Sequence, residues 1–239
     1  MMDNMRKILF LLIGLTLALG SSAQKDTISI KQTPEKSFLK KQILPVSLIA
    51  TGTALNFGTL KKDIQKQFPN THTTIDNALQ FTPMVQMYAY DLMGFQHKNT
   101  VFDQTKYLII SQAASVLVVQ SLKRITKVER PTGVRTSFPS GHTTCAFVGA
   151  TMLYKEFKDT DPFLAYSGFA VATTTGILRI TNNKHWLSDV VTGAGLGILT
   201  VNMVYHFEPL KNWQPFKKNK KLSVTPVLTP NSVTVLCRF

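Results

Sequence analysis

Three short polar segments between residues 123 and 189 decide how this sequence is interpreted. They read KRITKVERP (123–131), PSGH (139–142) and RITNNKHWLSD (179–189). Each segment lies where a hydrophobic run begins or ends, so packing these runs side by side as helices would gather the segments at one end of a bundle. The sequence therefore predicts a positively charged cup with two histidines at that end.

The first and third segments supply three cations to this cup. Lys123 and Arg130 are seven residues apart, which is about two helical turns, so both side chains face one way if the helix continues towards Pro131. Pro131 is expected to end this helix, because proline disfavours helical backbone in the residue before it. Arg179 opens the third segment and provides the third cation.

The second segment predicts a helix start that binds an anion. Ser140 is a favourable N-cap, and the unpaired amides of Gly141 and its neighbours would point at a phosphate placed there. Arg130 and Arg179 can each donate two hydrogen bonds to phosphate oxygens, and Lys123 adds a point charge. These five residues are the predicted phosphate-binding set.

The two histidines predict the chemistry. His185 and Asp189 are spaced i, i+4, so the carboxylate can hold one ring nitrogen while the other faces outward. We expect His185 to attack phosphorus and form a phosphohistidine, with Asp189 orienting its ring. His142 would protonate the leaving alkoxide and then accept a proton from water. This mechanism rests on positioning and charge stabilisation, and it requires no metal or other cofactor.

The order and spacing of these residues resemble the motifs of the type 2 phosphatidic acid phosphatase (PAP2) and vanadium haloperoxidase superfamily, in particular its bacterial lipid phosphatases. The three motifs are Lys-x6-Arg-Pro, Pro-Ser-Gly-His and Arg-x5-His-x3-Asp. The resemblance is close over residues 123–189 and loose in the helical runs on either side. It implies a PAP2-like helical fold, with His185 as nucleophile, Asp189 as its partner and His142 as acid. It also implies that the five residues of the predicted set bind phosphate.

Each of these residues, taken singly, has an ordinary structural explanation. Lysine and arginine near the ends of apolar helices are often interfacial anchors or solvated caps, and His142 alone would be a helix-start residue. The third segment also departs from the family pattern, because Leu178 precedes Arg179 where serine is usual. Every position with a chemical role is nevertheless present in the right order, and this favours the functional interpretation.

The first 23 residues have the pattern of a secretory signal peptide. A short basic region is followed by an apolar run over 8–19 and by small residues up to Ala23, after which cleavage is expected. An uncleaved transmembrane helix is the alternative, but the apolar run is shorter than the roughly twenty residues that a span requires. Residues 24–42 are predicted to form a polar leader, and export would place the enzyme outside the cytoplasm.

The remaining apolar runs predict an all-α fold, a PAP2-like bundle of about six helices in one phosphatase domain, residues 43–207. The bundle helices are expected over residues 43–57, 79–95, 107–122, 141–157, 163–178 and 186–207. An amphipathic helix over 61–76 would cover the top of the bundle. Gly193, Gly195 and Gly197 are predicted sites of close helix contact.

Residues 208–239 are predicted to form a basic tail. The lysines of 208–221 are typical of either a solvated tail or contact with an anionic membrane. Alternation in residues 222–239 around Thr229-Pro230-Asn231 favours a short C-terminal β-hairpin.

Membrane association is favoured by nearly uncharged helical runs and by a net charge of +14, which suits an anionic lipid surface. Most uncharged runs, however, are about fifteen residues long, and the mean hydropathy is near zero, which favours a soluble periplasmic protein. If the signal is cleaved, the mature chain starts outside the cytoplasm, and three full spans would then place Lys123 on the cytoplasmic side. We therefore expect a membrane-associated enzyme with its site facing the periplasm. This topology requires one of three things: the signal is retained as an anchor, an early apolar run does not span the membrane, or the bundle only docks on the bilayer.

These features favour a phosphatase that hydrolyses a phosphomonoester or pyrophosphate of a membrane lipid. The candidate substrates are lipid A phosphate, phosphatidic acid, phosphatidylglycerol phosphate and undecaprenyl diphosphate, with lipid A preferred for an exported basic chain. The expected partners are this lipid and an anionic membrane surface, and no nucleic acid. The alternatives are a vanadate-dependent haloperoxidase, because the same cup can hold vanadate, and a soluble broad-specificity acid phosphatase.

Overall fold

The computed structural model divides the chain into two units, Met1–His206 and Phe207–Phe239, which are described separately. The predicted signal peptide and the first part of the polar leader lie outside the described residues. The rest of that leader is helical, because the first helix begins at Pro34 and not at residue 43 as predicted. Proline suits the first turn of a helix, and the Glu and Lys residues that follow are good helix formers. The structure describes residues 34–57, 59–207, 209–210, 213, 223–229 and 232–238.

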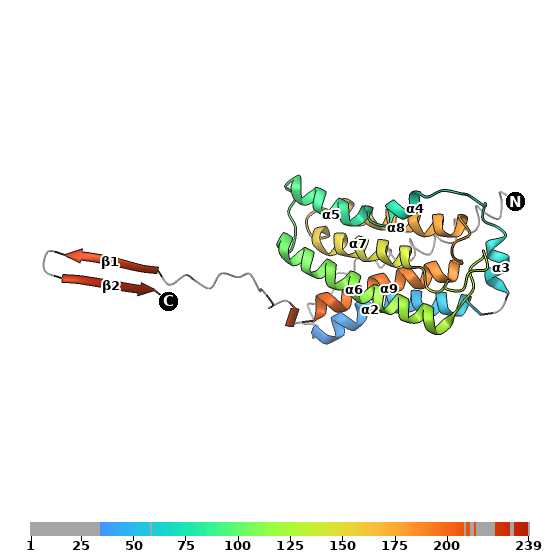
Figure 1. Cartoon of the computed structure of the whole chain (residues 1–239), viewed down its shortest axis with the longest axis horizontal. Coiled ribbons are helices and arrows are strands. Elements are labelled where there is room, and N and C mark those ends of the chain that lie inside the picture. Colours follow the sequence, from blue (N-terminus) through green and yellow to red (C-terminus); the bar gives the residue numbers. More distant parts are fainter. Residues whose placement is uncertain are drawn as a thin grey trace, which may run out of the picture. The chain divides into compact units, whose positions relative to one another are not determined.

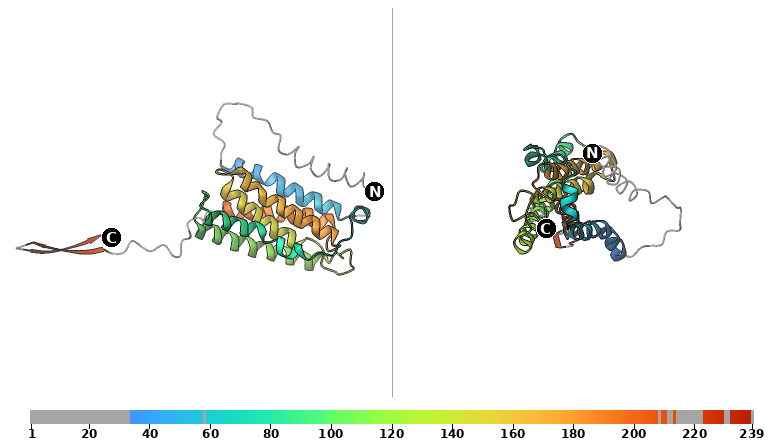
Figure 2. Two further views of the ribbon diagram at one scale, coloured as in Figure 1. Left: turned by 90° about the horizontal axis from the view of Figure 1, so that it is seen from above. Right: turned by 90° about the vertical axis from the view of Figure 1, so that its right-hand side faces the viewer.

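The first unit is a bundle of helices that run side by side (Figures 1 and 2). The long helices are α2 (Pro34–Leu55), α6 (Val101–Thr126), α7 (Gly141–Phe157), α8 (Pro162–Thr181) and α9 (Leu187–His206). The shorter ones are α3 (Leu60–Gln65), α4 (Ile75–Leu79) and α5 (Thr82–Leu92). The predicted all-α helical bundle is confirmed.

Helix α9 packs closely between α2 and α7 because glycines remove side chains at the contacts. A Cβ added at Gly193 would lie 2.8 Å from the carbonyl oxygen of Ser140, and one at Gly195 would lie 2.7 Å from the carbonyl oxygen of Pro45. Gly197 makes an equally close approach to α7. The predicted close-contact role of the three glycines is confirmed, and the Gly193 contact places the start of α9 against the start of α7.

Residues 61–76 do not form the single amphipathic helix that the sequence predicts. They contain α3, an extended segment and the first residues of α4. In the extended segment the backbone N–H of Thr71 donates to the carbonyl of Thr181 (2.8 Å), and that of Thr73 donates to the side chain of Asn182 (3.1 Å). These bonds to the end of α8 take the place of local helical bonds, so tertiary contacts override the helical periodicity.

Helix α6 is longer than the helix expected over 107–122 but stops before Pro131. Thr100 caps its start, and Lys127 adopts a left-handed backbone conformation (φ 49°) at its end. The prediction that the helix continues towards Pro131 is therefore wrong. Arg130 lies in the loop after α6 and not two turns along the same helix.

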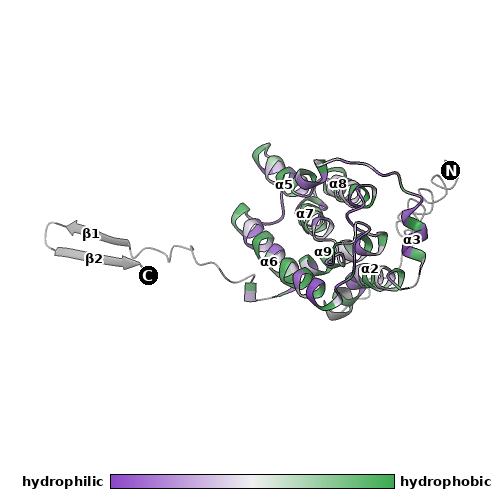
Figure 3. Cartoon of the chain, turned by 45° about the vertical axis from the view of Figure 1, so that its right-hand side comes forward, coloured by the Kyte–Doolittle hydropathy of each residue, from purple (hydrophilic) through white to green (hydrophobic). Residues whose placement is uncertain are grey.

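Three helices in the part of the chain that the structure describes are long and apolar enough to cross a membrane: α6, α8 and α9. They contain 26, 20 and 20 residues, so they exceed the uncharged runs of about fifteen residues counted in the sequence. They are longer because they continue through polar residues at their ends, such as Lys123 and Arg179. Hydrophobic residues occur along the helices of the bundle (Figure 3). The exposed ones include Ile109, Val116 and Leu117 of α6.

The second unit contains a two-stranded antiparallel hairpin of β1 (Ser223–Thr229) and β2 (Ser232–Arg238). Ser223 pairs with Arg238 at one end, and Thr229 pairs with Ser232 at the other. This is the short hairpin that the alternation around residue 230 predicts.

Candidate active site

Four helix ends bring the polar segments together at one end of the bundle. Lys123 lies in the last turn of α6 and Arg179 in the last turn of α8. Ser140 immediately precedes α7, and Asp189 lies in the first turn of α9. The backbone N–H of Ser140 donates to the carbonyl of Asp189 (3.0 Å), which joins the second and third segments directly.

His185 is buried in the loop between α8 and α9. Its Nδ1 lies 3.2 Å from Oδ2 of Asp189, although α9 begins only at Leu187 and the histidine is not itself helical. The same oxygen accepts hydrogen bonds from the backbone N–H of Trp186 (2.9 Å) and from the hydroxyl of Ser137. Because Nδ1 faces this fixed carboxylate, Nε2 is the nitrogen left to attack phosphorus.

Burial sets the charge of both histidines. It lowers the pKa of His185 to about 4, while the Asp189 carboxylate acts in the opposite direction. Burial, followed by the positive charge of Arg179, lowers the pKa of His142 to about 4. Both imidazoles are therefore neutral at pH 7. Neutral His185 can act as a nucleophile, whereas His142 can act as an acid once the negative charge of a bound phosphate raises its pKa.

Lys123 holds the loop that leads into α7. Its ammonium group donates to the carbonyl oxygens of Thr136 (2.6 Å) and Ser137 (3.1 Å). Its positive charge also lowers the pKa of both His142 and His185. The structure therefore places this predicted phosphate-binding residue on backbone carbonyls, from where its charge acts on the cup.

The two arginines present guanidinium groups to the same region. A tight turn holds Arg130: its backbone N–H donates to the carbonyl of Val134 (2.8 Å), and its carbonyl accepts from the N–H of Gly133 (2.9 Å). Burial and the positive charge of Arg179 lower the pKa of Arg130. Within the described residues, the buried Nε atoms of both arginines have no hydrogen-bond partner. An anion between the two groups would satisfy these donors and relieve their repulsion.

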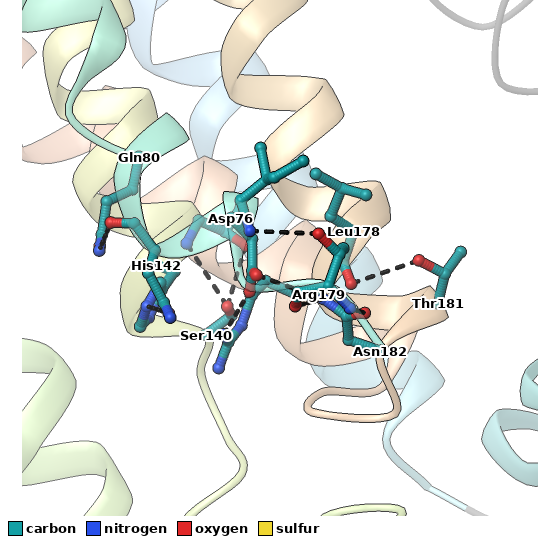
Figure 4. Close-up of polar contacts among 12 residues, drawn as sticks. Asp76, Gln80, Ser140, His142, Leu178, Arg179, Thr181 and Asn182 are labelled. Atoms are coloured by element: carbon teal, nitrogen blue, oxygen red, sulfur yellow. Dashed lines mark hydrogen bonds and ion pairs between the residues drawn. The ribbon is translucent and has the colours of Figure 1, made fainter. Parts of the chain in front are cut away.

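Asp76 in α4 forms a buried ion pair with Arg179, through Oδ2 and Nη1. Its second oxygen accepts a hydrogen bond from the side chain of Asn182 (3.2 Å). The close-up shows these side chains meeting from α4 and the end of α8 (Figure 4). Asp76 was not among the residues predicted from sequence, because nothing in its local spacing distinguishes it from a solvated acidic residue.

The start of α7 carries Ser140, Gly141 and His142. The Ser140 side chain caps the helix by accepting from the N–H of Thr143, as predicted. A Cβ added at Gly141 would meet only a Val119 methyl group, at 3.8 Å. Nε2 of His142 lies 3.0 Å from the side-chain oxygen of Asn77 in α4. Asn77, like its neighbour in α4, was missed by the sequence analysis.

Comparison with known proteins shows what the part of the chain that carries the candidate site is similar to. Residues 104–213 match the family model of the PAP2 superfamily. This stretch, 110 of the 239 residues, contains all three polar segments. The resemblance inferred from residues 123–189 is thereby confirmed.

The chain is also similar to a curated relative and to two solved structures. It is 36% identical over 157 residues to a lipid A 1-phosphatase of Porphyromonas gingivalis, an alignment that covers 64% of this chain and 35% of the relative's length. Aquifex aeolicus LpxE is 22% identical with a TM-score of 0.46, over 62% of this chain and 93% of that one. A transmembrane PAP2-type phosphatidylglycerolphosphate phosphatase from Bacillus subtilis is 18% identical with a TM-score of 0.42, over 84% and 95% of the two chains.

Proposed function

We propose that this protein is a phosphatase that hydrolyses a phosphomonoester or pyrophosphate of a membrane lipid. The observation that carries the proposal is the arrangement of His185, which is buried and paired with Asp189, at the same end of the bundle as two guanidinium groups with unpartnered buried nitrogens. A neutral, oriented imidazole next to an anion-binding cup is what a covalent phosphoryl transfer requires.

In the proposed reaction, Nε2 of His185 attacks phosphorus and the bond from phosphorus to the leaving oxygen breaks. His142 donates a proton to that oxygen, which departs as an alcohol. His142 then accepts a proton from water, and the resulting hydroxide attacks the phosphohistidine, breaking the P–N bond and releasing phosphate. Arg130 and Arg179 stabilise the charge on the phosphoryl oxygens in both steps, together with the amide of Gly141.

We propose that the substrate is lipid A and that the enzyme hydrolyses the ester bond of its 1-phosphate. The support is the 36% identity to a protein named lipid A 1-phosphatase. The three helices that could cross a membrane, and the exposed apolar residues of α6, support association with the bilayer in which such a lipid resides. An exported protein with its site facing the periplasm would meet this lipid after the lipid crosses the inner membrane.

The proposal is tested by phosphate release from purified lipids in neutral detergent with a chelator present. Wild type is expected to release phosphate from lipid A faster than from phosphatidic acid, phosphatidylglycerol phosphate or undecaprenyl diphosphate. Mass spectrometry of lipids from cells with and without the protein would identify the phosphate removed. Turnover of p-nitrophenyl phosphate alone would instead favour a soluble acid phosphatase, and peroxide-dependent bromination after vanadate addition would favour a haloperoxidase.

A further inference from the structure

A cavity of about 410 Å³ lies beside the candidate active site. Its wall includes Lys62 of α3, Lys66 directly after that helix, Phe68, and Pro131 and Trp186 from the loops that carry the site. The volume falls within the range of small-molecule sites and is far larger than one phosphate group needs. The cavity can therefore hold a headgroup.

Two residues of the cavity wall are neighbours, in the sequence, of predicted site residues. Pro131 directly follows Arg130, and Trp186 directly follows His185. Helix α3 is fixed to the same loop, because the side-chain amide of Gln65 donates to the carbonyl of Ile180 (2.9 Å) and to the side chain of Asn183 (2.6 Å). The cavity wall therefore includes the residue that directly follows Arg130 and the residue that directly follows His185.

The wall of the cavity combines aromatic and apolar surfaces with two positive charges. Trp186 is held by its indole N–H, which donates to the carbonyl of Glu129 (2.6 Å), and Phe68 is partly buried. The ring of Phe68 is an apolar surface that can pack against a sugar ring. Trp186 is buried, and the ammonium group of Lys61 lies 5.6 Å from the centroid of its ring, which adds positive charge beside the cavity. Lys66 forms an ion pair with Asp63, at 3.0 Å on the protein surface, and exposed pairs of this kind are weak enough to exchange for another anion.

We propose that this cavity is a headgroup subsite that binds a phosphorylated sugar, with Lys62 and Lys66 contacting a second acidic group on the substrate beyond the phosphate that is cleaved. The inference rests on the proposed function and makes it more specific. It predicts that the enzyme selects lipids whose headgroup is a ring with two acidic groups over lipids that carry a single phosphate on glycerol.

The test compares lipid A that carries two phosphates with the derivative that retains only the phosphate to be cleaved, both in neutral detergent. The double variant Lys62→Ala/Lys66→Ala is expected to raise KM about 10-fold for the two-phosphate lipid. It should change kcat/KM for the one-phosphate lipid by less than about 2-fold. The matched control is Lys40→Ala/Lys41→Ala, which removes the same charge from exposed positions near the start of α2 and is expected to alter neither substrate.

Each other outcome overturns the inference in a recognisable way. One such outcome is that wild type and the Lys62/Lys66 variant hydrolyse both lipids with the same KM. In that case the proposed subsite is refuted while the proposed function stands. An equal loss on both lipids that appears only in anionic vesicles would assign the two lysines to contact with the bilayer surface. If wild type releases phosphate from neither lipid, the proposed function fails and the subsite fails with it.

Discussion

The carboxylate of Asp76 in α4 forms a buried ion pair with the guanidinium of Arg179 at the end of α8, across 103 positions of sequence. The relative exposure is 1% for Asp76 and 5% for Arg179. This pair fixes the guanidinium in the cup and provides a counter-charge for one of the cations there. In the proposed mechanism Asp76 is therefore a positioning residue, which acts on phosphate binding through Arg179.

Replacing Asp76 by asparagine is expected to destabilise the protein. Arg179 would remain buried without its counter-charge, which costs about 3–5 kcal/mol in the free energy of unfolding. Inorganic phosphate should therefore raise the Tm of Asp76→Asn more than that of wild type, because the added anion supplies the missing charge. The exposed Asp159→Asn substitution is the control. Equal Tm values for Asp76→Asn and wild type would contradict the stabilising role of this pair.

Substitution of the histidines is expected to separate catalytic from structural roles. His185→Ala should abolish phosphate release, and His142→Ala should reduce it at least about 100-fold, in the range of a lost general acid. His72→Ala and His97→Ala should change it little, because neither side chain lies among the cup residues. Mass spectrometry of rapidly quenched enzyme should detect a phosphohistidine at His185. Full activity in His185→Ala would refute the mechanism.

The pH profile should identify the acid and the nucleophile. His185 must be neutral to attack, and its pKa in the free protein is about 4, so kcat/KM is expected to fall as the pH drops through about 4. Bound phosphate moves the corresponding fall in kcat to a higher pH. His142 must be protonated to act, and bound phosphate raises its pKa above the value of about 4 in the free protein. In wild type, kcat should therefore also fall on the alkaline side, at a pH above that of the acid limb.

The variant that checks this assignment is His142→Ala, measured between about pH 3.5 and 9 in one mixed buffer. Without the acid, the residual kcat should keep its acid limb and lose its alkaline limb. An alkaline limb that persists unchanged in this variant would show that some other group supplies the proton.

Two glycine substitutions should distinguish packing from phosphate contact. A Cβ at Gly193 would lie 2.8 Å from the carbonyl oxygen of Ser140, whereas one at Gly141 would meet only Val119 at 3.8 Å. Gly193→Ala is expected to lower the free energy of unfolding by about 1–3 kcal/mol through overpacking. Gly141→Ala should leave Tm nearly unchanged and raise KM, because its methyl group would crowd the bound phosphate. A stable Gly193→Ala, or a Gly141→Ala with wild-type KM, would contradict these roles.

Local interactions explain why much of the site could be predicted. Ser140 caps α7 as its position in the sequence predicts, and His185 and Asp189 meet at their predicted i, i+4 spacing even though α9 begins between them. The glycines of α9 are likewise at the predicted contacts. Caps and helical periodicity depend on residues a few positions apart, so they can be inferred without knowing the fold.

The errors have a common physical cause. The predicted helix over 61–76 does not form because Thr71 and Thr73 bond to the end of α8. Arg130 leaves the helix because Lys127 adopts a left-handed conformation and ends α6 early. In both cases a tertiary contact or a single backbone conformation outweighs a weak local preference.

The amino-acid sequence by itself was enough to predict the candidate site residues, because the three polar segments and their internal spacings are local features of the chain. Only the tertiary structure decided what surrounds them. Asp76 reaches Arg179 and Asn77 reaches His142 over separations of 103 and 65 residues. The cavity is lined by α3 and by loops from two other regions of the chain. Such contacts depend on how the whole bundle packs, so no local pattern contains them.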